Sequence, residues 1–207
     1  YDSVSQAREV NIGVPQGSTL GPLLFILYIN DMSNVLKHAY PIIFADDTTL
    51  FVSSTNVENV LTLLNEDILN LAEWFKANKL SLNLSKTNYI LFTTSLPVRA
   101  LDITFSIGSH TIERVYNTKF LGVFIDDRLS WNIHINHVCL KLRKSLGIIR
   151  KASAVLDTQT LINLYYTMLF PCQTYCHLIW GKASNFLLKK LLKLKKRAKR
   201  IICNVHW

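Results

Sequence analysis

The pattern of apolar and polar residues predicts three elements in the first part of the chain. A short apolar run at residues 23–30 follows a loop rich in glycine and proline, and it predicts a buried helix. Two apolar segments within residues 42–53 predict a tight hairpin with Asp46 and Asp47 at its turn. Residues 57–80 carry apolar side chains at helical spacing, which predicts one amphipathic helix packed on a sheet.

Further along the chain, the pattern predicts three more strands and then three helices. The strands are expected at residues 88–93, 103–107 and 119–125. The helices are expected at residues 132–153, 158–170 and 184–203. Asp157 is suited to cap the second of these helices, and Pro171 is expected to end it. Strands followed by helices predict an α+β chain with two domains, residues 1–127 and 128–207.

Composition is that of a globular protein, but charge divides the chain into two parts. Hydrophobic residues make up 49% of the 207 residues, and four cysteines do not indicate a secreted disulfide scaffold. The net charge of +9 combines 8 basic and 13 acidic residues in 1–127 with 15 basic residues and a single acid in 128–207. The first part is suited to bind cations and the second to bind polyanions such as phosphate backbones. A solvated basic helix face explains the same charge without a ligand.

Basic and apolar residues alternate in the last predicted helix. A helix buries the apolar set and directs most of the basic set toward a nucleic-acid duplex. The candidates for backbone contacts are Lys189, Lys190, Lys193, Lys196, Arg197 and Arg200. A membrane surface or a calmodulin-like partner is the alternative for such a helix. We expect no membrane span, because the longest apolar run is far shorter than the roughly 20 residues that a bilayer requires.

Asp46 and Asp47 are the strongest candidates for chemistry. Two adjacent carboxylates at a hairpin turn repel one another and raise each other's proton affinity unless a cation lies between them. Magnesium or manganese ions suit such hard oxygen ligands, and two ions would support phosphoryl transfer. The alternative to a metal site is an ordinary solvent-exposed turn without a ligand. A second pair, Asp126 and Asp127, fits a structural role better, because Arg128 is adjacent and a predicted helix start lies nearby.

Several motifs occur in a fixed order along the chain. The first are Gly13-Val14-Pro15-Gln16-Gly17-Ser18-Thr19-Leu20-Gly21-Pro22-Leu23-Leu24-Phe25, Tyr28-Ile29-Asn30-Asp31 and Phe44-Ala45-Asp46-Asp47. The later ones are Trp74-Phe75, Asn78-Lys79-Leu80, Lys86-Thr87, Phe120-Leu121-Gly122-Val123 and Trp131. In order and spacing, these motifs resemble those of reverse transcriptases encoded by non-LTR (LINE-like) retrotransposons. The resemblance implies a polymerase palm-type antiparallel sheet packed with helices, followed by a helical thumb.

The resemblance also implies roles for individual residues. Asp46 and Asp47 would hold two magnesium or manganese ions. The loop and strand residues against the nucleotide and template would be Gly13, Pro15, Gln16, Gly17, Ser18, Phe44 and Ala45. Lys86 would donate a proton to departing pyrophosphate, although a lone lysine is usually a surface charge. The residues that hold the primer end would be Phe120, Leu121 and Gly122, although a buried strand explains the same letters.

The implied partners are an RNA template, a DNA primer and deoxynucleoside triphosphates, with no obligate protein partner evident. The resemblance is compatible with an intracellular location that includes the nucleus, which the residues themselves do not determine. Histidines and cysteines indicate no second site, because their spacing fits neither a common zinc knuckle nor a catalytic triad. These residues are Cys172, Cys176, His177, Cys203, His206, His110, His134 and His137.

The sequence departs from the family in one respect that matters for activity. Such polymerases place a further catalytic aspartate on a strand upstream of the Pro-Gln-Gly loop, and Asp2 is the only aspartate before Gln16. The chain also begins at Tyr1, so we expect a fragment. Two hypotheses follow: part of an RNA-directed DNA polymerase, inactive by itself, or a truncated remnant that only binds nucleic acid. A viral RNA-dependent RNA polymerase fits less well, because Ala45 precedes the pair where those enzymes usually have glycine.

Overall fold

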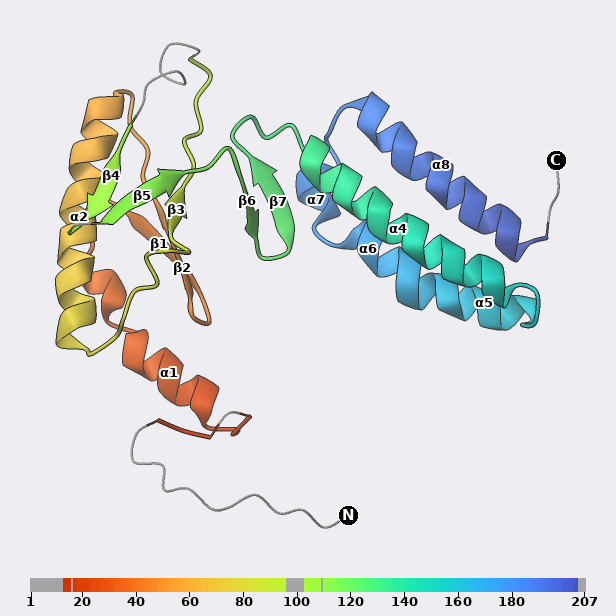
Figure 1. The fold of residues 1–207 in the computed structure, drawn as a ribbon, viewed down its shortest axis with the longest axis horizontal. Helices are drawn as coiled ribbons and strands as arrows, with labels where there is room; N and C mark the ends of the chain where they lie inside the picture. The colour runs from red at the N-terminus through yellow and green to blue at the C-terminus, as the bar shows by residue number, and fades with distance from the viewer. Residues whose placement is uncertain (1–12, 16, 96–102, 109, 205–207) are drawn as a thin grey trace. The chain divides into compact units, whose positions relative to one another are not determined.

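The computed structural model describes residues 13–15, 17–95, 103–108 and 110–204, which combine helices with small antiparallel sheets (Figure 1). The chain divides into two compact units. The first comprises Tyr1–Thr87 and Thr104–Glu113, and the second comprises Asn88–Ile103 and Arg114–Trp207.

The first unit contains the hairpin with the paired aspartates. Its elements are α1 (Gly21–Ile29), the short 3-10 helix η1 (Met32–Val35), β1 (Tyr40–Phe44), β2 (Asp47–Phe51), α2 (Val57–Ala77), β4 (Phe105–Ile107) and most of β5 (His110–Arg114). Strands β1 and β2 are antiparallel, and Phe44 pairs with Asp47 across the turn. The predicted hairpin and the predicted amphipathic helix are therefore confirmed.

Helix α2 organises the core of this unit. The Asn56 side chain accepts a hydrogen bond from the backbone N–H of Glu58 (3.0 Å) and so caps the helix start. Leu71 and Trp74 of α2 are buried against Ile29 and Met32. Phe25 of α1 also packs against this cluster, so the core holds α1 through Phe25 and Ile29.

Residues 23–30 were expected to form a buried helix, and the expectation of burial is wrong. The helix forms, but most of its apolar side chains are exposed: Leu23, Leu24, Ile26, Leu27 and Tyr28. The reason is that, among the described residues, the α1 side chains packed into the core around α2 are those of Phe25 and Ile29. A helix of this composition normally buries most of its surface.

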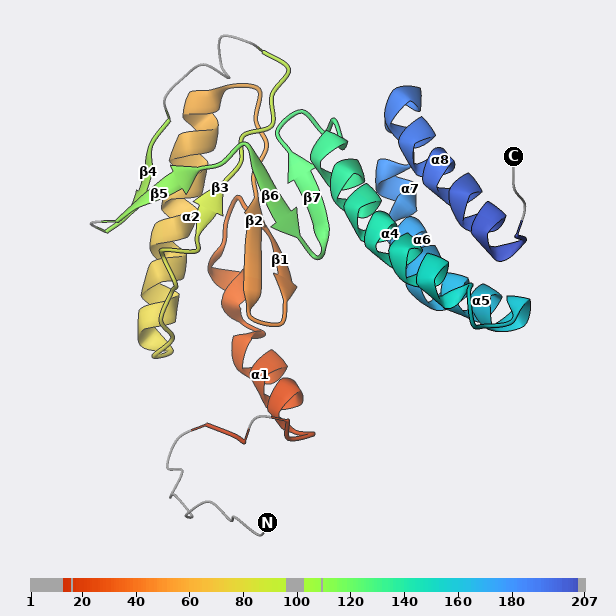
Figure 2. The ribbon, with the colours of Figure 1, turned by 45° about the vertical axis from the view of Figure 1, so that its right-hand side comes forward.

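The second unit is mainly helical. Its elements are β3 (Asn88–Tyr89), β6 (Asn117–Phe120), β7 (Val123–Asp126), α4 (Asn132–Ala152), α5 (Thr158–Leu164), the π-helix η2 (Tyr165–Leu169), α6 (Phe170–Thr174), α7 (His177–Trp180) and α8 (Asn185–Ile202). One core joins these helices, and α4 packs along α8 (Figures 1 and 2). The predicted helices at 132–153 and 184–203 are confirmed, and Asp157 caps α5 as expected, with its carboxylate accepting from Gln159 N (3.1 Å).

Residues 119–125 do not form the single strand that was predicted. They form the antiparallel β6–β7 hairpin, in which Phe120 pairs with Val123. Both residues between them have positive φ, 43° at Leu121 and 86° at Gly122. Type I′ hairpin turns require this conformation. The turn was not predicted because Leu121 is apolar and continues the apolar pattern of a strand.

The structure differs from the predicted elements in three other places. The strand expected at 88–93 covers only Asn88–Tyr89. Strand β5 was missed because Ile112 is its only buried residue, so no alternation is visible. Pro171 does not end the helix, because η2 interrupts it first and Pro171 then falls in the first turn of α6, where its missing N–H leaves no broken bond.

The two compact units do not coincide with the domains predicted from the sequence. The predicted boundary at residue 127 lies inside the second unit, because β7 packs against α4. The β6–β7 hairpin thus belongs with the helices that follow it. The assignment of palm and thumb stays a prediction.

Candidate metal centre and nucleic-acid interface

Asp46 and Asp47 lie at the exposed turn of the β1–β2 hairpin. Ala45 turns the chain with φ of 52°, and Asp47 is already the first residue of β2. Both carboxylates are exposed, as is Phe44 before them. A non-glycine residue in the left-handed region is strained, which is the backbone state often found at functional sites. In both ribbon views this turn lies beside α1 (Figures 1 and 2).

No side chain in the described part of the chain neutralises this pair. Neither Asp46 nor Asp47 forms a hydrogen bond or an ion pair with another described side chain. Their oxygens are therefore available to a hard cation such as Mg²⁺. The described residues bring no third His, Cys, Asp or Glu to the pair, so these two carboxylates supply only part of a coordination sphere.

The Gly/Pro loop lies directly before α1. Gly13 and Gly17 have φ of 87° and 86°, which side chains with a Cβ rarely adopt. Ser18 N donates to Pro15 O (3.1 Å), and Ser18 Oγ accepts from Gly21 N (3.0 Å) at the start of α1. The loop is thus tied to the helix by Ser18. Gln16 lies outside the described residues.

Asp67 of α2 supports the start of the β1–β2 hairpin, and sequence analysis missed it. Its buried carboxylate accepts hydrogen bonds from three backbone N–H groups that precede β1, those of Lys37 (2.8 Å), His38 (2.9 Å) and Ala39 (2.5 Å). Burial raises the pKa of Asp67, but the three hydrogen bonds outweigh it and the pKa lies below its ordinary value. The signal was an aspartate on the apolar stripe of the helix, beside Ile68 and one turn before Leu71.

The second aspartate pair has the structural role that was expected for it, which Asp126 shows directly. Asp126 is buried and accepts hydrogen bonds from Arg128 N (3.1 Å), Ser130 N (3.0 Å), Ser130 Oγ (3.0 Å) and Trp131 N (3.1 Å). Burial raises its pKa, whereas the bonds from Ser130, Arg128 and Trp131 bring the pKa below its ordinary value. Asp126 thus fixes the connection from β7 to α4.

The remaining predicted residues lie in two turns. Lys86 is exposed in a turn in which its backbone N donates to Asn83 O (3.1 Å). Phe120, Leu121 and Gly122 occupy the end of β6 and the turn of the β6–β7 hairpin. Leu121 and Gly122 are exposed in the turn, whereas Phe120 is half-buried and pairs with Val123.

Helix α8 separates its basic and apolar residues by face. Leu187, Leu191, Ala198 and Ile202 are buried in the core shared with α4. Lys189, Lys193, Lys196 and Arg200 follow the spacing i, i+4, i+7 and i+11, which places them along the opposite face. We call these four residues the basic ridge. Arg197 is exposed beside it, whereas Lys190 donates to Asn136 Oδ1 of α4 (3.2 Å) and lies over the Phe186 ring.

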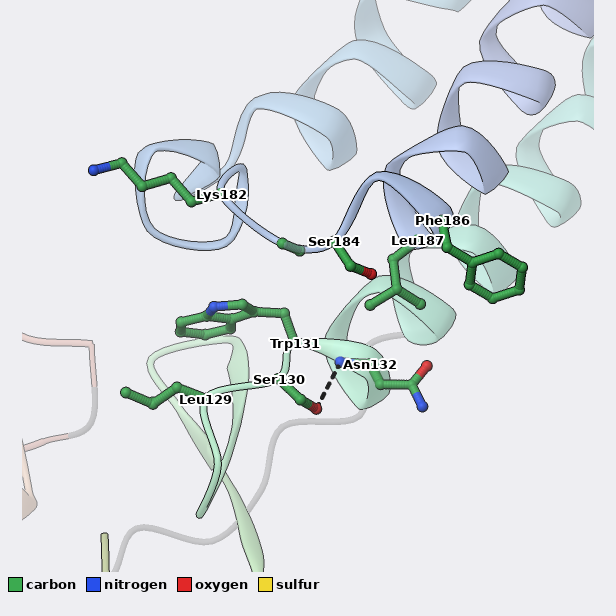
Figure 3. Close-up of a pocket in the computed structure, with 9 residues that line it drawn as sticks. Leu129, Ser130, Trp131, Asn132, Lys182, Ser184, Phe186 and Leu187 are labelled. Carbon is green, nitrogen blue, oxygen red and sulfur yellow. Dashed lines mark hydrogen bonds between the residues drawn. The ribbon is translucent and has the colours of Figure 1, made fainter. Parts of the chain in front are cut away.

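An open pocket of about 520 Å³ lies where α4 and α8 begin (Figure 3). Leu129, Trp131, Phe186 and Leu187 line it, together with Lys182 and polar neighbours. It includes none of the predicted site residues. Among the described residues, no helix has the length and hydropathy needed to span a bilayer.

Histidine 134 has the structural role that the sequence indicated. It is buried, its Nδ1 accepts from Phe124 N (3.3 Å), and its ring lies 5.6 Å from that of Trp180. Burial, with smaller contributions from His137 and Lys141, lowers its pKa. The neutral ring therefore joins β7 to the helices.

Comparison with known proteins assigns the class of this chain. Residues 2–125 match the sequence model of the family "Reverse transcriptase (RNA-dependent DNA polymerase)". The match covers more than half of the chain, so the chain belongs to this family.

The relatives confirm the predicted resemblance to non-LTR retrotransposon enzymes. The chain is 26% identical to the probable RNA-directed DNA polymerase from transposon X-element of Drosophila melanogaster, over 100% of this chain and 23% of that protein. It is 27% identical to the RNA-directed DNA polymerase from mobile element jockey of Drosophila funebris, over 98% and 23%. The type-1 retrotransposable element R1 Pol polyprotein of Bradysia coprophila is 26% identical over 89% and 19%. The chain therefore spans between 19% and 23% of the length of these relatives. No solved structure matches it.

Proposed function

We propose that this chain is the part of an RNA-directed DNA polymerase that runs from the catalytic palm into the thumb, and that the whole enzyme copies retrotransposon RNA into DNA. The observation that supports this most is the exposed, unneutralised pair Asp46 and Asp47 in a chain of the reverse transcriptase family. The proposed substrates are an RNA template, a DNA primer and deoxynucleoside triphosphates.

Two magnesium or manganese ions are the proposed cofactors, with Asp46 and Asp47 as ligands. When bound, such ions lower the pKa of an attacking hydroxyl and stabilise charge on a leaving phosphate. The protein contributes a short, strained turn that leaves two consecutive aspartates exposed to solvent. The described residues supply only these two, so the proposed site takes its remaining ligand from outside the described part of the chain.

The other assigned residues surround nucleotide and primer in this proposal. Gly13 and Gly17 keep side chains away from the loop backbone, so that Pro15, Gln16 and Ser18 can approach the nucleotide. Phe44 and Ala45 directly precede Asp46 and lie against the nucleotide and template. Lys86 donates a proton to the departing pyrophosphate.

The proposed thumb binds the template–primer duplex through the basic ridge. The apolar face of α8 is already buried against α4, so it is not free to enter a membrane or to fill a partner's groove. The exposed face is basic, and lysine and arginine contacts to phosphates hold a duplex without selecting its sequence.

The test replaces one aspartate of each pair in the polymerase that contains this chain. Asp46→Ala is expected to lower magnesium-dependent primer extension about a thousandfold or more, because it removes a ligand on which several kcal/mol of transition-state stabilisation depend. Asp126→Ala is expected to lower the melting temperature instead, since it leaves buried N–H groups without an acceptor. Equal losses of activity in two folded variants would contradict the assignment.

A second candidate function is nucleic-acid binding without synthesis, which the basic ridge favours. A wild-type protein that binds duplex but extends no primer, with either magnesium or manganese, would support this candidate over the first.

A further inference from the structure

Tyr175 contacts the turn of the β6–β7 hairpin from the helical part of the second unit. Its hydroxyl donates to the backbone carbonyl of Leu121 (2.6 Å). Its ring is close enough to Gly122 that a Cβ there would lie 3.3 Å from Cε1. Leu121 and Tyr175 are 54 positions apart in the sequence, so this contact joins the hairpin to a distant part of the chain.

The backbone is strained on both sides of this contact. Leu121 has φ of 43° and Cys176, the neighbour of Tyr175, has φ of 52°. Neither residue is a glycine, so each holds a conformation that L-residues disfavour. Strain of this kind persists only where surrounding contacts fix it, and it is concentrated at functional sites.

Buried groups hold Tyr175 in place. Helix α6 ends at Thr174, and the carbonyl of Tyr175 accepts a hydrogen bond from Trp180 Nε1 (2.8 Å). Trp180 is 3% exposed and belongs to the helical core. The Tyr175 side chain itself is 52% exposed, so it is a surface group on a fixed backbone. Packing alone does not explain an exposed aromatic residue directed at a turn.

The contact determines how one backbone donor is presented. A peptide unit is planar and trans, so holding the Leu121 carbonyl also fixes the Gly122 N–H, which points to the opposite side. Gly122 is exposed, and this N–H has no acceptor among the described residues. A free backbone N–H at a tight turn is suited to a phosphate oxygen.

We propose that Tyr175 is a positioning residue for the primer: its hydroxyl orients the Leu121–Gly122 peptide so that the Gly122 N–H donates to a phosphate oxygen near the primer's 3′ end. The inference rests on the proposed polymerase function and on the assignment of residues 120–122 to the primer end. It adds a residue that the sequence motifs did not indicate.

The experiment compares Tyr175→Phe with Tyr166→Phe in the polymerase that contains this chain. Tyr166 is a matched control, because it is 57% exposed and its hydroxyl has no hydrogen-bond partner among the described residues. Loss of one hydrogen bond is expected to lower kcat for primer extension about fivefold to tenfold in Tyr175→Phe only. The Kd for duplex is expected to stay the same in both variants, and the melting temperature is expected to fall by no more than about 2–4 °C in Tyr175→Phe.

A modified primer separates positioning from a general structural role. With a neutral methylphosphonate at the last primer linkage, the wild type is expected to lose activity severalfold, whereas Tyr175→Phe loses little more, because both changes remove the same contact. Multiplicative losses, or equal losses in Tyr166→Phe, overturn the inference. A wild type that extends no primer overturns the proposed function and the inference together, whereas an active wild type with an unaffected Tyr175→Phe overturns only the inference.

Discussion

Individual carboxylates in this chain differ in role because their surroundings differ. Asp67 and Asp126 are buried and use their oxygens to accept backbone N–H groups, which keeps both pKa values low. Asp46 and Asp47 are exposed and have no such donors among the described residues. Only the exposed carboxylates, those of Asp46 and Asp47, therefore have free lone pairs that can bind a cation. Sequence neighbours indicated this difference for Asp126 and Asp127, but not for Asp67.

The first prediction concerns Asp67. We expect Asp67→Ala to lower the free energy of unfolding by about 3 kcal/mol or more, because three backbone N–H groups lose a charged acceptor. Chemical denaturation measures this change. Glu66→Ala is the control, since Glu66 is a surface neighbour that pairs only with exposed Lys37 and His38, and we expect it to change stability much less.

The same residue gives a dependence on pH. The folded pKa of Asp67 is lower than the ordinary value of 3.8, so the unfolded chain binds a proton first as acid is added. The contribution of Asp67 to stability is therefore complete above the unfolded pKa and is lost as the pH falls through the folded pKa. Asp67→Asn should reduce this acid destabilisation. An unchanged acid profile would contradict the role given to Asp67.

At the scale of elements, the sequence predicted helices better than turns. The apolar spacing located α2, α4 and α8, because each buries one face continuously. The turn at Leu121 and Gly122 was missed because nothing local marks an apolar residue that tertiary contacts hold at positive φ. Tyr175 was missed for a related reason, since its partner lies far away in the sequence.

The candidate site was predictable where short motifs define it. The Asp46–Asp47 turn and the Gly/Pro loop are contiguous in sequence, so their residue types and spacing suffice. The support from Asp67 and Tyr175 depends on the folded chain. The basic face of α8 was predictable as a set, but the engagement of Lys190 with Asn136 and Phe186 depends on helix packing.

Helix α8 provides the prediction at this scale. In a binding assay with an RNA–DNA duplex, replacement of Lys189 and Lys193 by glutamine is expected to reduce the slope of log Kd against log salt by about 2, because two phosphate contacts are lost. The control replaces Lys195 and Lys199 by glutamine. This double substitution removes the same amount of charge, but from residues outside the basic ridge. Equal changes in both double variants would mean that total charge, and not the ridge, determines binding.

At the scale of the whole molecule, the first unit exposes large apolar side chains on both α1 and the β1–β2 hairpin. Leu24 and Leu27 of α1 and Tyr40 and Phe51 of the hairpin are all exposed. A stable domain seldom leaves so many large apolar side chains in water on neighbouring elements. The chain spans 23% of the length of the X-element and jockey relatives, which is consistent with further segments that cover this surface in the longer protein.

The last prediction concerns a polypeptide of residues 1–207 alone, which is expected not to extend a primer when template, nucleotides and magnesium are supplied. The described residues hold two carboxylates without a third, and alignment of a hydroxyl with a phosphate requires both ions to be fixed. Fusion of the preceding segment of a related element to Tyr1 should supply the missing ligand and cover α1. Primer extension by the fusion, abolished by Asp46→Ala, is the expected result. Extension by the unfused chain, lost on Asp46→Ala, would show that its site is already sufficient, whereas a folded fusion that binds duplex but never extends would favour a chain that only binds nucleic acid.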